Sequence, residues 1–245
     1  MPTATELLDR RADGVPHERL ADAFLAFDRW TGDDPLLLLA EAAAASTGQR
    51  YLTGVRPTAE RFRDAFLETG RIGSYADLAA LELDDDGLVE AFGAERKRRV
   101  LLEAADVLAD RPGDDLTALR SWAAEADVYR YDEDPIGAIA GVGPATFQYL
   151  RMLAGVDTVK PDPPTVELVE GLADDLENSP LDATEPLRTV ASCEWLACET
   201  GYRRLEIDRI AWWHAADEDE RAAASDDGHA VGSEDERAAT DGDPD

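Results

Sequence analysis

The chain has 245 residues, of which 54 are Asp or Glu and 24 are Lys or Arg, and its formal net charge is -30 at pH 7. With 44% hydrophobic residues it can bury the core of an ordinary domain, which excludes a wholly disordered chain. Its two cysteines exclude a disulfide scaffold. No apolar run has the roughly 18 residues of a membrane span, and Met1-Pro2-Thr3 begins no signal peptide, so we expect a cytoplasmic protein without a membrane partner.

The large acidic excess has two interpretations. Carboxylates repel phosphates, so a charge of -30 ordinarily argues against a nucleic-acid partner. Acidic chains with few lysines are also typical of salt-saturated cytoplasms, and the lysines of this chain are Lys97 and Lys160 alone. We interpret the charge mainly as an adaptation to a halophilic cell, so it does not decide the partner.

The pattern along the chain predicts helices as far as residue 215. Residues 1–33 are expected to form an N-terminal helical extension and residues 34–215 the main domain. Apolar residues recur at spacings of three and four, as in Leu101, Ala105 and Leu108, and turn residues such as Arg111–Asp114 separate the periodic runs. The sequence contains no β-hairpin signature and no convincing strand alternation, so we predict an all-α fold of roughly ten helices.

Residues 216–245 have a different composition from the rest of the chain. They hold twelve acidic residues and two arginines, and Val231 is their only large aliphatic residue. Such a segment buries too little apolar surface to offset its chain entropy. We therefore predict a disordered acidic tail.

One local sequence, residues 134–154, carries most of the functional information. A short apolar helix is expected to end at Ala140, Gly141 and Gly143 bracket Val142, and a second helix is expected to begin at Pro144. Glycines leave no Cβ between the backbone and a ligand, and the second helix would direct unpaired amides and its positive dipole end out of the turn. These groups would form a neutral cradle for a phosphate. The alternative is a plain glycine turn between two packed helices.

This segment resembles a helix-hairpin-helix motif of the endonuclease III type, and the resemblance covers about residues 34–215. Pro35–Glu41 resembles the buried first helix of that family, and Phe62–Gly93 and Ala94–Asp110 resemble its small helices and its basic helix. Gly155–Asp162 lies where the family has its Gly/Pro…Asp loop, and Tyr202–His214 is similar to the closing helix of a cluster-free subgroup. The resemblance to these DNA glycosylases implies a two-lobed helical domain, double-stranded DNA as partner, and base-excision repair as function.

The resemblance implies that Asp162 is the catalytic carboxylate, which activates a water molecule and stabilises the cationic sugar as a damaged base leaves. Asp162 followed by Pro163 is also typical of a helix N-cap, and one residue can serve both roles. Ala145 occupies the position of the lysine of bifunctional members, so only a monofunctional glycosylase is expected. No iron–sulfur cluster is expected, because Cys193 and Cys198 cannot supply four ligands and are interpreted as buried small hydrophobic residues.

The resemblance also implies the groups that contact DNA. Gly141, Val142 and Gly143 would grip a phosphate together with the first turn of the second helix, Ala145 and Thr146, and a monovalent cation often accompanies this grip in the family. The dense basic run is a second candidate for backbone contacts, and two further cations lie near the hairpin and the catalytic loop: Arg96, Lys97, Arg98, Arg99, Arg151 and Lys160. The alternative is a solvated helix face and a solvated loop lysine. Thr47 or Gln49 lies where the family places its strand-invading residue.

We thus expect a monomeric DNA-binding protein that removes a modified base. Two other functions fit the same residues. The protein could be a catalytically silent relative that holds DNA without cutting it, or an interaction protein that uses the hairpin only as a packing corner.

Overall fold

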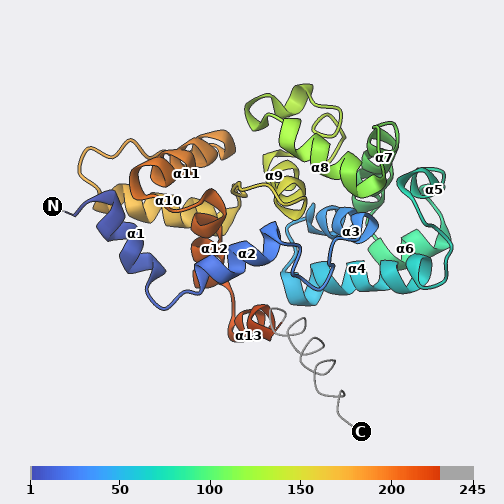
Figure 1. The fold of residues 1–245 in the computed structure, drawn as a ribbon, viewed down its shortest axis with the longest axis horizontal. Helices are drawn as coiled ribbons and strands as arrows, with labels where there is room; N and C mark the ends of the chain where they lie inside the picture. Colours follow the sequence, from blue (N-terminus) through green and yellow to red (C-terminus); the bar gives the residue numbers. More distant parts are fainter. Residues whose placement is uncertain (1, 227–245) are drawn as a thin grey trace, which may run out of the picture.

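The computed structural model describes residues 2–226, and within these residues every regular element is a helix (Figure 1). This confirms the predicted all-α class. The helices form two groups of packed elements, and the chain passes between them twice, through residues 26–34 and through residues 154–162 (Figure 1). Within the described residues, no helix is both long enough and apolar enough to cross a bilayer.

The first group is built around α3 (Pro35–Ala45), whose residues 36–44 are all buried. Asp34 caps this helix by accepting hydrogen bonds from the amides of Leu36 and Leu37, and Pro35 takes the first helical position. The elements that surround α3 or pack on its neighbours are η1 (Tyr51–Val55), α4 (Arg56–Phe62), η2 (Arg63–Leu67), α5 (Tyr75–Ala79), α6 (Asp86–Phe92), α7 (Glu95–Ala109), α8 (Asp115–Glu125), η3 (Val128–Glu133) and α9 (Pro144–Leu153).

The second group combines both ends of the chain. Its elements are α1 (Ala4–Ala12), α2 (His17–Leu25), α10 (Pro163–Asp175), α11 (Pro186–Thr200) and α12 (Arg204–Ala215). α1 packs against α10 and α11, and α2 packs against α12 through a buried face that includes Leu20, Ala21 and Phe24. The residues expected to form an N-terminal extension therefore contribute to the core of this group.

The acidic segment begins with one more helix, α13 (Glu218–Asp226). The side chain of Asp217 accepts a hydrogen bond from the amide of Glu220, and acidic residues in the first turn suit the positive end of the helix dipole. The Arg221 side chain donates to the carbonyl of Trp213 at 2.9 Å, which ties the helix to the end of α12. The segment predicted to be disordered from residue 216 thus carries a helix at residues 218–226, and the rest of the predicted tail, 227–245, lies outside the described residues.

The two cysteines of α11 differ in their surroundings. Cys193 is buried, as expected, whereas Cys198 is exposed. The five-residue separation turns the two side chains by about 140° relative to each other on the helix, so one faces the core and the other faces solvent.

Candidate functional site

The hairpin has a regular second helix, but its first half is a single turn. Asp134 accepts a hydrogen bond from the amide of Ile136 at 2.8 Å, and the amide of Ala138 donates to the carbonyl of Asp134 at 2.8 Å. The helix expected to end at Ala140 is therefore reduced to this capped turn, and Gly137 in its middle does not favour a longer helix. The second helix, α9, begins at Pro144 as predicted.

The two glycines of the loop have different roles. Gly141 has φ +115°, and a Cβ there would lie 3.0 Å from Cγ of Arg96 and 3.1 Å from Cγ2 of Val100, so both its backbone conformation and its close neighbours require glycine. Gly143 has an ordinary φ of -117° and is the N-cap residue of α9. A Cβ at Gly143 would meet nothing within 4 Å, so this position leaves the approach to the helix end open.

The first turn of α9 presents unpaired amides next to this opening. No side chain caps the helix, and its first backbone bond runs from the amide of Phe147 to the carbonyl of Gly143. Among the described residues, the amides of Ala145 and Thr146 therefore have no hydrogen-bond acceptor, and both residues are half-buried. Such a helix end favours an anion.

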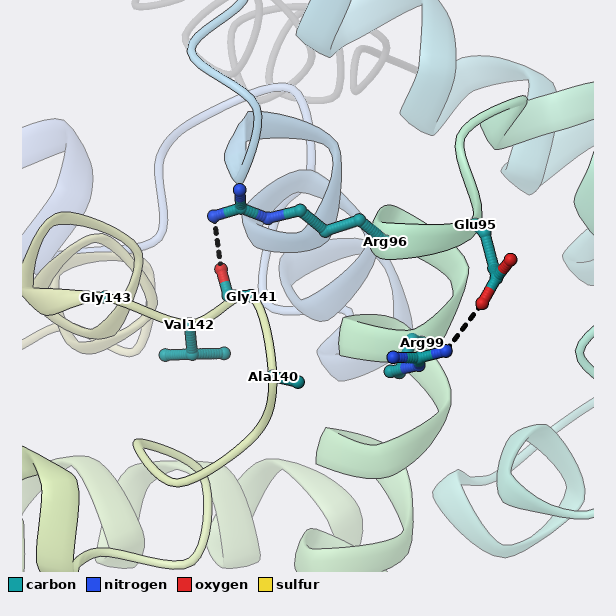
Figure 2. A pocket seen from close by; sticks show the side chains of 7 residues that line it. All are labelled: Glu95, Arg96, Arg99, Ala140, Gly141, Val142 and Gly143. Carbon is teal, nitrogen blue, oxygen red and sulfur yellow. Dashed lines mark hydrogen bonds and ion pairs between the residues drawn. The ribbon is translucent and has the colours of Figure 1, made fainter.

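The structure brings part of the basic run against this loop (Figure 2). Nη2 of Arg96 donates a hydrogen bond to the carbonyl of Gly141 at 2.9 Å, across 45 residues of sequence. Together they border an open hollow of about 450 Å³, lined by Glu95, Arg96, Arg99, Ala140, Gly141, Val142 and Gly143. Glu95 lies at 2.5 Å from the guanidinium of Arg99 and offsets part of its charge.

The other basic candidates do not reach this hollow. Lys97 is only 2% exposed, and its ammonium donates to Oε1 of Gln49 at 2.7 Å. Arg98 donates to the carbonyls of Leu83 and Gly93. Arg151 donates to the carbonyl of Ala123 and to the side chain of Gln148, both within 2.9 Å. These three side chains satisfy hydrogen-bond acceptors of the fold, so Arg96 and Arg99 are the candidate cations that border the hollow at the hairpin.

Asp162 lies at the start of α10, in the N-cap position that the sequence predicts. Its side chain does not cap the helix; Oδ2 instead lies 3.1 Å from Nζ of Lys160, and the two side chains are 25% and 23% exposed. Nζ of Lys160 also lies 4.6 Å from the ring centroid of Tyr149, a cation–π contact. Lys160 is thus held by its neighbours rather than solvated.

Two buried carboxylates lie behind this pair, and the sequence interpretation did not include them among the site residues. Asp208 accepts a hydrogen bond from the amide of Lys160 at 2.8 Å; burial raises its pKa, and the charge of Asp162 contributes to the rise. Glu41, on α3, accepts a hydrogen bond from the hydroxyl of Tyr149 and pairs with Arg29 at 2.6 Å. Burial and then the charge of Glu41 raise the pKa of the Tyr149 hydroxyl well above its ordinary value.

A continuous series of contacts therefore runs from Asp162 through Lys160 and Tyr149 to Glu41. The signal for its buried end was present in the sequence, because Glu41 interrupts an otherwise apolar helix. A carboxylate in such a helix must find a partner or be neutralised.

Comparisons of the chain with family models, with curated proteins and with solved structures find no match. Within residues 2–226, no group of three or more His, Cys, Asp or Glu side chains is placed to hold a metal ion.

Proposed function

We propose that this protein binds double-stranded DNA through its hairpin and cleaves the N-glycosidic bond of a modified base, as a monofunctional DNA glycosylase of the endonuclease III type. One observation carries the proposal: the hollow in which the Gly141–Gly143 loop meets Arg96 and Arg99. Two guanidinium groups border this hollow, and the unpaired amides of the first turn of α9 follow the loop directly, on a chain with a net charge of -30. Amides are neutral donors, which suits binding in molar salt, where the counterion-release contribution of lysines is small.

Asp162 would perform the chemistry once a nucleotide is flipped out of the duplex. Its carboxylate would stabilise the positive charge that develops on the sugar and accept a proton from the attacking water. The water oxygen bonds to the anomeric carbon, and the base leaves with the electron pair of the broken bond and takes up a proton. Ala145 offers no amine, so no covalent imine with the sugar forms.

The expected monovalent cation would bind carbonyl oxygens of the hairpin. The carbonyl of Gly141 already accepts a hydrogen bond from Arg96. A cation at this carbonyl would therefore require Arg96 to move, and we propose that the guanidinium supplies part of the positive charge instead.

DNA binding is tested by changing Gly143. A Cβ at Gly143 meets nothing within 4 Å, so Gly143→Glu should fold normally, and its carboxylate would oppose a phosphate. We expect the dissociation constant for a duplex, measured by fluorescence anisotropy in molar KCl, to rise about tenfold or more, as for the loss of one charge-assisted contact. Gly73→Ala is the matched control, because Gly73 is remote from the hairpin in sequence and its Cβ would meet only Asp77, at 3.8 Å. Equal affinity of Gly143→Glu and wild type would exclude the hairpin as a DNA site and leave the interaction protein.

The catalytic step is tested by base release from a panel of damaged duplexes in molar KCl, with alkali to reveal abasic sites. Asp162→Asn should lower the rate about a hundredfold or more, the usual contribution of a positioned acid or base.

One observation favours the catalytically silent DNA-binding protein: an ammonium 3.1 Å away already neutralises Oδ2 of Asp162, so the carboxylate stabilises a cationic sugar less well. That alternative is supported if wild type and Asp162→Asn release bases at the same rate while both bind the duplex.

A further inference from the structure

A second hollow, of about 220 Å³, lies where α4, the end of α6 and the start of α7 meet the segment after α3. It shares no lining residue with the hollow at the hairpin. Its polar lining residues are Gln49, Thr53, Thr58, Arg61, Glu90 and Lys97.

Two cations line this hollow without a carboxylate partner. The ammonium of the buried Lys97 donates only to Oε1 of Gln49. Arg61 donates through Nε and Nη2 to the carbonyl of Ala91 and through Nη2 to the hydroxyl of Thr58 at 3.0 Å. Among the described residues neither cation forms an ion pair. Glu90, the carboxylate that also lines the hollow, pairs with neither of them.

The hollow consequently holds two cations that no carboxylate of the described residues pairs with. Burial lowers the pKa of Lys97, and the nearby charge of Arg61 lowers it further. Lys97 is buried without a carboxylate partner, which is costly, and an anion between the two cations would remove this cost. This arrangement stands out in a chain with 54 acidic and 24 basic residues, where carboxylates are abundant.

The remaining donors match an oxyanion with several acceptor atoms. Lys97 uses one of its three N–H groups on Gln49, whose amide nitrogen remains a donor because its oxygen accepts. The hydroxyl of Thr58 accepts from Arg61, so its own hydrogen can point to a ligand. Nη1 of Arg61 also remains available as a donor, because it forms no hydrogen bond among the described residues.

We propose that this hollow binds a phosphate group, held by Lys97 and Arg61. The group is either free inorganic phosphate or a phosphate of a DNA backbone. The first source is independent of the proposed function, whereas the second rests on it.

The test titrates inorganic phosphate into the full chain at constant ionic strength and measures the dissociation constant by calorimetry and the shift in melting temperature. Lys97→Met and Arg61→Gln should each weaken binding about tenfold or more, the effect of losing one charge-assisted hydrogen bond. Arg63→Gln is the matched control, because Arg63 follows α4 directly but pairs with Asp64 and Glu68 outside the hollow. It should change the constant less than about twofold. Arg61 is exposed, so its variant keeps the test valid if Lys97→Met does not fold.

A second arm measures the affinity of the same variants for a DNA duplex. Phosphate binding that is lost in both variants, with duplex affinity unchanged, identifies free phosphate as the ligand. Duplex affinity that falls about tenfold in both variants but not in Arg63→Gln identifies a backbone phosphate. The proposal is overturned if wild type and both variants respond alike to phosphate and also bind a duplex alike. Failure of the Gly143→Glu test leaves the phosphate arm unaffected, so the two proposals fail separately.

Discussion

Replacing Glu41 by leucine is expected to destabilise the fold strongly. The side chain of Glu41 is 0% exposed and that of its partner Arg29 is 11% exposed. Burial opposes the charge of Arg29, but Glu41 together with Tyr51 and Tyr149 outweighs burial, and the pKa of the guanidinium is raised. Oε2 of Glu41 and Nη1 of Arg29 are buried without a hydrogen-bond partner, so each charged group lacks one of the hydrogen bonds that water would provide. Removing Glu41 leaves a buried guanidinium with no compensating charge.

The loss of one partner of a buried ion pair costs about 3–5 kcal/mol of the free energy of unfolding. For a chain of this size that corresponds to a fall in melting temperature of roughly 6–20 °C. Urea unfolding of wild type and Glu41→Leu, followed by circular dichroism at fixed molar KCl, measures the difference. The double variant Arg29→Met with Glu41→Leu should lose about 2 kcal/mol less than the sum of its single changes, because no charge remains buried.

Glu60→Gln is the control for this experiment. Glu60 pairs with Arg56 at 3.0 Å on α4, but the two side chains are 36% and 26% exposed, so the change should cost less than about 1 kcal/mol. The reasoning is refuted if Glu41→Leu lies within about 1 kcal/mol of wild type and its effect adds to that of Arg29→Met without coupling.

Three further predictions follow from local geometry. Gly137→Ala should lower the free energy of unfolding by about 3 kcal/mol in urea titrations, because a Cβ at this position would lie 1.7 Å from the carbonyl oxygen of Tyr131. A variant as stable as wild type would contradict the packing of this turn. Hydrogen bonds from Thr184 lower the pKa of Asp182 to about 2. The carboxylate of Asp182 therefore contributes to stability fully above pH 3.8, its ordinary pKa, and this contribution is lost as the pH falls through 2. NMR titration of the carboxyl group measures the pKa, and a midpoint near 3.8 would refute the prediction. Cys198 should react rapidly with Ellman's reagent in the native protein, whereas burial raises the pKa of the Cys193 thiol and shields it from the reagent. Rapid reaction of both thiols would contradict the burial of Cys193.

The basic run shows what helix geometry could have predicted from the sequence. On α7, Lys97 precedes Leu101 by four residues, and Leu101 is fully buried. The period of 3.6 residues therefore places Lys97 on the core face, and Arg96 and Arg99, three residues apart, on another face. What no local pattern could predict is that this second face meets the loop at Gly141, because that contact depends on how α7 and α9 pack around α3.

The hairpin illustrates the opposite case. The start of α9 at Pro144 and the N-cap position of Asp162 both follow from local rules for proline and helix ends, and the structure has them where the sequence predicts them. The orientation of the Asp162 carboxylate toward Lys160, rather than toward the helix amides, depends on Tyr149 from another helix. Helix propensity is local, whereas the direction of a charged side chain is decided by its partners.

The packing of α2 against α12 has a consequence for synthesis on the ribosome. About 180 residues separate the two helices, so at 5–20 residues per second α2 emerges roughly 10–40 s before its partner exists. During that interval Leu20, Ala21 and Phe24 have no completed surface to cover them, while residues 35–153 can already assemble around α3. In the nascent chain, α2 therefore remains without its packing partner while the helices of residues 35–153 are already packed. The order of folding runs from the middle of the polypeptide outward.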